Sequence, residues 1–136
     1  MSAMQRYFKN LKVAEETGRS MELKTLWIDP INTCNLKCIM CRSKHKSGNE
    51  ITVDDLRDLL IQARDMEVEK INFGITAEAT LYGSLYYILN ESKALGFTLN
   101  IFTNLNFNKI GDDLFRAISL VDNLSISIDA ATRRTY

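Results

Sequence analysis

The residues best suited to chemistry are three cysteines that lie within eight positions, in the segment CNLKCIMC at 34–41. They are all the cysteines of the chain, and their spacing is C-x3-C-x2-C. Three is an odd number, so an internal disulfide would leave one thiol over. Thiolates are ligands for soft or borderline metals, so this spacing predicts a metal site rather than a crosslink.

Two kinds of metal site are compatible with these thiols. A structural zinc ion needs four ligands, so a zinc site would have to recruit His45 and would have the spacing C-x3-C-x2-C-x3-H. A four-iron iron–sulfur cluster can be held by three cysteines of one loop, which leaves one iron open to a substrate or cofactor. The alternative to the iron–sulfur cluster is therefore a non-catalytic, zinc-stabilised binding domain.

The composition indicates a soluble globular unit without a charge signature. The chain has 136 residues, 46% of them hydrophobic, and 17 basic against 17 acidic residues. No basic excess points to nucleic acid, and we find no signal peptide and no apolar stretch long enough for a membrane span. We therefore expect a cytoplasmic, reducing setting, in which clustered cysteines are typical of metal-binding or catalytic sites.

Strand and helix patterns alternate along most of the chain. An amphipathic helix at 1–18 is expected to pack on the domain as a flanking element. The predicted strands are 23–29, 70–73, 98–103 and 124–129, and the predicted helices between them are 52–66, 85–95 and 110–121. This order predicts an α/β fold with a parallel sheet and right-handed crossovers, with a flanking segment at 1–22 and one domain at 23–136.

Polar residues and thiols follow each predicted strand. In parallel α/β sheets and barrels the active groups lie at the carboxyl ends of the strands. The residues at these four ends are the cysteine loop, Gly74 to Glu78, Thr103 with Asn104, and Ser127 with Asp129. We therefore expect them to gather at one rim of the sheet.

The cysteine motif after a first strand resembles that of the radical S-adenosylmethionine (SAM) superfamily. The segment INFGITAEATL at 71–81 is similar to the second-strand segment of that family, which usually ends in Gly-Gly-Glu-Pro. LNIFTN at 99–104 and LSISIDAATRRTY at 124–136 are similar to its third and fourth strands. The resemblance covers roughly residues 23–136 and implies a partial, TIM-like (βα) barrel.

The resemblance implies a cofactor set and a reaction. Cys34, Cys38 and Cys41 would hold a [4Fe-4S] cluster, and the amino and carboxylate groups of SAM would chelate its fourth iron. Reductive cleavage of SAM would give a 5′-deoxyadenosyl radical that abstracts a substrate hydrogen. The implied partners are an electron donor such as flavodoxin or ferredoxin and a substrate that is a peptide or a small molecule. No residue is assigned a catalytic role.

The resemblance also implies which residues hold SAM, although each has a simpler alternative. The backbone carbonyls of Thr76, Ala77 and Glu78 would meet the amino group, Ser127 and Asp129 the ribose, and Asn104 belongs to the same site. Alternatively, the Glu78 carboxylate stabilises the N-terminus of the following helix through the helix dipole, Asn104 is a turn residue after a strand, and Ser127 and Asp129 cap a following helix.

This sequence departs from the family pattern in the segment 76–79, and it contains fewer βα units than that pattern. Thr76, Ala77 and Ala79 replace Gly, Gly and Pro, and an alanine at 77 would be strained if the backbone there required a positive φ. The family pattern has six βα units, whereas only about four are predicted before Tyr136. We therefore expect the 136 residues to form an incomplete catalytic domain with an unpaired sheet edge.

Overall fold

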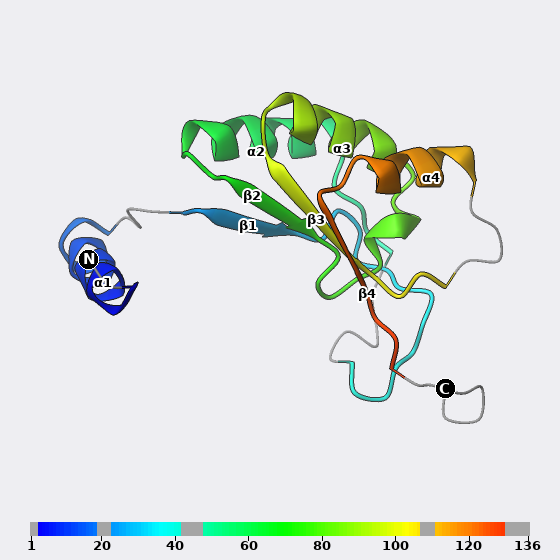
Figure 1. Ribbon diagram of the computed structural model, residues 1–136, viewed down its shortest axis with the longest axis horizontal. Coiled ribbons are helices and arrows are strands. Elements are labelled where there is room, and N and C mark those ends of the chain that lie inside the picture. The colour runs from blue at the N-terminus through cyan, green and yellow to red at the C-terminus, as the bar shows by residue number, and fades with distance from the viewer. Residues whose placement is uncertain (1–2, 19–22, 42–47, 107–110, 130–136) are drawn as a thin grey trace.

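A computed structural model describes residues 3–18, 23–41, 48–106 and 111–129 (Figure 1). Four parallel strands form one sheet in the order β1 (Thr25–Ile28), β2 (Lys70–Phe73), β3 (Thr98–Thr103) and β4 (Asn123–Ile126). The helices are α1 (Ala3–Thr17), α2 (Val53–Asp65), α3 (Leu85–Ala94) and α4 (Asp112–Ser119), with a 3₁₀ turn, η1 (Ala79–Leu81). The predicted α/β fold with alternating strands and helices is confirmed.

Local sequence explains where the first crossover helix begins. Thr52 takes an extended backbone conformation, and its hydroxyl oxygen accepts a hydrogen bond of 3.1 Å from the backbone N–H of Asp55. Asp54 and Asp55 place negative charge in the first turn, where the helix dipole favours it. The predicted N-terminus of this helix is therefore confirmed by its capping geometry.

The hydrophobic core lies between the sheet and the three helices that cover one of its faces, α2, α3 and α4 (Figure 1). Alternate strand residues point into this core, and Ile71, Phe73, Leu99 and Ile101 are fully buried there. The helices contribute Leu56, Leu60, Leu85, Ile88 and Leu89 to the same cluster. The core therefore holds the strands rigidly from one side and leaves their other face open.

The open face of the sheet carries a polar row and an aromatic pair. Asn123 donates to Asn100 at 2.8 Å and Asn100 donates to Asn72 at 2.6 Å, so three neighbouring strands are linked by side-chain amides. Trp27 and Phe102 stack with their ring centroids 5.4 Å apart. These residues alternate with the core residues along their strands, so they lie on the open face of the sheet.

One sequence expectation about an apolar helix face is wrong. The helix α1 lies apart from the sheet, and none of its described side chains belongs to the core, although it was expected to pack on the domain (Figure 1). On α4, Phe115 is 68% exposed, whereas Ala117 is buried. Helical period fixes which residues share a face, but the partner of that face depends on distant parts of the chain.

The fourth strand is shorter than predicted, because pairing with β3 ends at Ile126 rather than at residue 129. Residues 127–129 continue past the sheet into the region described below. Within the described part of the chain, no helix combines the length and apolar content that crossing a membrane requires.

Candidate functional site

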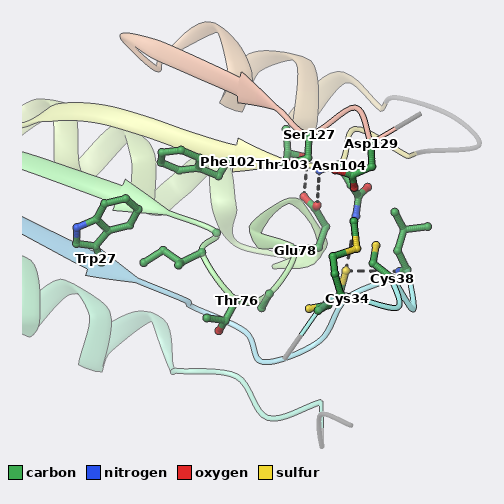
Figure 2. Close-up of a pocket in the computed structure, with 16 residues that line it drawn as sticks. Trp27, Cys34, Cys38, Thr76, Glu78, Phe102, Thr103, Asn104, Ser127 and Asp129 are labelled. Atoms are coloured by element: carbon green, nitrogen blue, oxygen red, sulfur yellow. Dashed lines mark hydrogen bonds between the residues drawn. The ribbon is translucent and has the colours of Figure 1, made fainter. Parts of the chain in front are cut away.

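The carboxyl ends of all four strands meet around one cavity of about 420 Å³ (Figure 2). Its lining includes every site residue predicted from the sequence: Cys34, Cys38, Cys41, Thr76, Ala77, Glu78, Asn104, Ser127 and Asp129. Trp27, Gly74, Ile75 and Phe102 also line this cavity. The structure thus brings the nine predicted residues together, while their roles remain predictions.

The cysteine loop is closed at its neck by backbone contacts. Ile31 and Glu50 form an isolated antiparallel bridge, and the N–H of Asn32 donates to the carbonyl of Asn49 at 3.0 Å. Within the loop, the N–H of Cys41 donates to the carbonyl of Cys38 at 3.1 Å. All three cysteines of the loop are free of disulfides and half-buried, so they are available to bind a metal and are partly shielded from water.

The loop after β2 is held by an aspartate that the sequence analysis did not select. The carboxylate of Asp29 accepts the N–H of Ile75 at 2.8 Å and the N–H of Thr76 at 3.1 Å, and it also accepts the Thr76 hydroxyl. Asp29 follows β1, so it is a polar residue at a strand end, which is the signal that could have revealed it. It positions the segment expected to meet the SAM amino group.

The same loop resolves the question of backbone strain at Ala77. The positive φ of this loop falls at Gly74, with a value of 83°. Among the described residues other than glycine, positive φ values occur at Glu67 and Leu105, and Ala77 is not one of them. The strain considered for an alanine at this position is therefore absent, and its methyl group is buried.

Glu78 joins three segments through its carboxylate and its backbone. The side chain is only 2% exposed and accepts hydrogen bonds from the Thr103 hydroxyl at 2.7 Å and from the Asn104 N–H at 2.8 Å. It also accepts the hydroxyl and N–H of Thr80 as the N-cap of η1. Its own N–H donates to the carbonyl of Thr33, next to Cys34, at 2.9 Å.

Three conclusions follow for Glu78. Hydrogen-bond donors within the protein pair with its buried carboxylate oxygens, which would otherwise be costly to remove from water. The simpler alternative, a carboxylate at a helix N-terminus, is correct for this short turn. Glu78 also fixes the end of β3 and the start of the cysteine loop relative to each other.

Asn104 also combines a turn role with a place in the cavity. Its side-chain oxygen accepts the N–H of Asn106 at 2.8 Å, which is the local turn contact expected of an asparagine after a strand. Its amide nitrogen lies 2.9 Å from Oδ1 of Asn35 and 3.6 Å from Sγ of Cys34 (Figure 2). The end of β3 therefore contacts the cysteine loop directly.

Ser127 and Asp129 reach the cavity from the end of β4 and are exposed. The N–H of Ser127 donates to the carbonyl of Thr103 at 2.8 Å, which keeps this segment next to β3 after the strand itself has ended. Two exposed polar side chains at this rim are suited to hydrogen bonding with a hydroxylated ligand.

Three thiols that line one cavity form a donor set that a four-iron cluster can use. No group of three or more His, Cys, Asp or Glu among the described residues is arranged around one metal position. Each cysteine of a four-iron cluster binds a different iron, so three thiolates that line one cavity do not have to converge on a point. His45, the fourth ligand of the zinc alternative, lies outside the described residues.

Comparisons with known proteins agree with this fold. No protein-family profile matches the chain. The tungsten-containing aldehyde ferredoxin oxidoreductase cofactor-modifying protein of Pyrococcus furiosus is 32% identical over 87 residues, which cover 60% of this chain and 24% of that protein. The chain thus spans about a quarter of the length of this curated relative.

Two solved structures share the fold. SuiB of Streptococcus suis, bound to S-adenosylmethionine, has a TM-score of 0.69 and 21% identity over 88% of this chain and 28% of its own; it is also known bound to the precursor peptide SuiA. BtrN, in complex with AdoMet and 2-DOIA, has a TM-score of 0.68 and 17% identity over 77% of this chain and 45% of its own. These matches confirm, at the level of the fold, the predicted resemblance to radical SAM enzymes.

Proposed function

We propose that this chain forms the cluster- and SAM-binding part of a radical SAM enzyme. The observation that carries the proposal is the single cavity that holds the three thiols together with the carboxyl ends of β2, β3 and β4. When bound, the [4Fe-4S] cluster and SAM would supply a reductive cleavage that takes one electron from an external donor such as flavodoxin or ferredoxin and gives methionine and a 5′-deoxyadenosyl radical for hydrogen abstraction from a substrate.

The residues of the chain have distinct parts in this proposal. Cys34, Cys38 and Cys41 hold the cluster through their thiolates. The backbone of residues 76–78, fixed by Asp29 on one side and by the Glu78 carboxylate on the other, presents carbonyl groups to the amino group of SAM. A loop that is already held in place loses little conformational entropy when it binds a ligand.

Ser127 and Asp129 complete the proposed SAM site. Both are exposed at the end of β4 and line the cavity, so their side chains can accept and donate hydrogen bonds to the ribose hydroxyls. The aromatic side chains of Trp27 and Phe102 form an apolar wall of the same cavity and limit the access of water from the open face of the sheet.

A peptide or protein is the proposed substrate class. The segment at 124–136 resembles family members that modify peptides, and SuiB is known bound to a precursor peptide. BtrN was solved with 2-DOIA, so the fold alone does not select the substrate. Titration of the loaded chain with peptides, followed by the fluorescence of Trp27, its single tryptophan, tests this class directly.

Anaerobic reconstitution tests the cluster. We expect about four irons per chain and a brown protein, and we expect replacement of any one of Cys34, Cys38 or Cys41 by Ala to impair iron binding strongly. His45→Ala is the matched control and should load normally. One zinc per chain with no iron uptake, or metal loss in the histidine variant alone, would establish the zinc-stabilised domain instead.

Addition of SAM to the reduced, loaded protein tests the second half of the proposal. The electron paramagnetic resonance spectrum should change, because SAM would bind the open iron of the cluster, and reduction with dithionite should yield 5′-deoxyadenosine. A fully loaded, folded protein with an unchanged spectrum and no nucleoside product would limit the function of this chain to cluster binding.

A further inference from the structure

The sulfur of Cys34 receives two N–H groups from different parts of the chain. One is the backbone N–H of Leu36, 3.5 Å away within the cysteine loop. The other is the side-chain amide of Asn104, 3.6 Å away and 70 residues later, at the end of β3. Both distances suit hydrogen bonds to sulfur, whose larger radius lengthens the contact. Cys34 is thus the thiol to which β3 supplies a side-chain donor.

The orientation of the Asn104 amide is fixed by its other contacts. Its oxygen accepts the backbone N–H of Asn106 at 2.8 Å, so that position must carry the carbonyl of the amide rather than its NH₂ group. The nitrogen then faces Cys34 and Oδ1 of Asn35, which is 2.9 Å away. In turn, Asn35 donates to the carbonyl of Asn106 at 2.7 Å. The contacts of Asn35 and Asn104 therefore fix the side-chain NH₂ group of Asn104 so that it faces the sulfur of Cys34.

The backbone of Asn104 is held as firmly as its side chain. Its N–H donates to the buried carboxylate of Glu78 at 2.8 Å, and the N–H of Glu78 donates to the carbonyl of Thr33, the residue before Cys34. The donor and the sulfur are therefore both tied to Glu78. Displacement of the Asn104 backbone away from the cysteine loop would require these contacts to break.

We propose that Asn104 is a positioning residue that sets the reduction potential of the cluster through its hydrogen bond to Cys34. This inference rests on the proposed function, because it requires the cluster. Reduction adds negative charge, part of which resides on the sulfurs, and an N–H aimed at a sulfur stabilises the reduced state more than the oxidised one. The amide therefore makes the cluster easier to reduce.

The test is a redox titration of the reconstituted chain without SAM, monitored by electron paramagnetic resonance. In Asn104→Leu, which removes the donor without adding charge, the ratio of reduced to oxidised cluster at a fixed potential should fall about tenfold, a shift of about 59 mV for one electron. The control is Asn106→Leu, the same substitution two residues away, which keeps the backbone N–H to Asn104. It should titrate like the wild type.

A second variant guards against misfolding of the first. Asn104→Asp keeps the side-chain shape and the oxygen that accepts the Asn106 N–H, but it has no donor for the sulfur. If Asn104→Leu fails to load iron, the redox titration is made with Asn104→Asp instead. The ratio of reduced to oxidised cluster at a fixed potential should then fall at least as much as predicted for Asn104→Leu. A purely structural role would reduce the iron content and leave the potential of the loaded fraction unchanged, which would overturn the inference.

The iron content of the wild type separates the proposed function from the proposed role of Asn104. A wild type that binds no cluster would overturn the proposed function and this inference with it. A wild type that loads about four irons, with a potential equal to those of Asn104→Leu and Asn104→Asp, would overturn this inference alone.

Discussion

Gly74 begins the loop after β2 and lies close to the backbone of β3, and replacing it by alanine gives a sharp test of the structure. Its φ is 83°, a backbone conformation that residues with a side chain rarely adopt. A Cβ atom at this position would lie 2.3 Å from the carbonyl oxygen of Phe102 and 3.3 Å from Cβ of Ala79. The first of these neighbours is the backbone of a central strand, so it cannot move aside at low cost.

Two contributions add up in Gly74→Ala. The positive φ alone costs about 1 kcal/mol for alanine. Forcing a methyl group into packed atoms costs about 1–3 kcal/mol more. We therefore expect the free energy of unfolding to fall by about 2–4 kcal/mol, against a typical total of about 5–15 kcal/mol. Phe102 should shift, which separates its ring from Trp27.

Equilibrium urea denaturation, followed by far-ultraviolet circular dichroism and by the fluorescence of Trp27, measures this loss. Two other glycines provide matched controls. Gly96 has a φ of 88°, and a methyl group added there would meet nothing within 4 Å, so Gly96→Ala isolates the backbone cost of about 1 kcal/mol. Gly83 has open space and no positive φ, so Gly83→Ala should be close to neutral. If Gly74→Ala lost no more stability than Gly96→Ala, the close approach of the loop to β3 would be refuted.

Three further predictions concern groups around the sheet, each measured by the same denaturation. Asp29→Ala removes the acceptor of the Ile75 and Thr76 N–H groups and should lower the free energy of unfolding by about 1–3 kcal/mol, with a smaller loss in Asp29→Asn. Equal stability of the wild type and both variants would contradict the proposed anchoring of the loop by Asp29. Tyr82→Phe removes the 2.9 Å hydrogen bond to the Ile51 carbonyl and should cost about 1 kcal/mol, whereas no loss would mean that this bond contributes nothing. The carboxylate of Asp122 accepts the backbone N–H of Leu99 and pairs with Lys93, and both contacts lower the pKa of this carboxyl from 3.8. The wild type should therefore be more stable than Asp122→Asn at pH 7, by about 1 kcal/mol or less for an exposed pair, and this difference should disappear as the pH falls below 3.8. A difference in stability that persists at pH 2 would refute this.

The strands and the cavity lining could be predicted because their signals are local. The runs at 70–73 and 98–103 are short, rich in β-formers and bounded by turn residues, and they match β2 and β3 residue for residue. Once parallel βα units are assumed, topology alone places the ends of all strands at one edge. This is why the nine predicted residues share a cavity even though they come from four segments.

The contacts that hold the site could not be predicted in the same way. Asp29 and its loop partners are 46 and 47 residues apart, and Asn104 and Cys34 are 70 apart, so no local pattern couples them. Glu78 was selected for its place in a motif, but its burial and its contacts with β3 depend on the register of the sheet. The separate position of α1 was missed for the same reason, since an apolar helix face does not identify its partner.

The tie between Thr33, Glu78 and the end of β3 also has a consequence for the order in which the chain folds. The turns and crossover helices close short loops, whereas this tie joins segments separated by 25 to 70 residues and gains its hydrogen bonds only after the intervening chain has been ordered. The rim of the sheet should therefore assemble late in folding. It should also open first under native conditions, so that amide hydrogens at residues 75–78 and 104–106 exchange with solvent before those of β2 and β3.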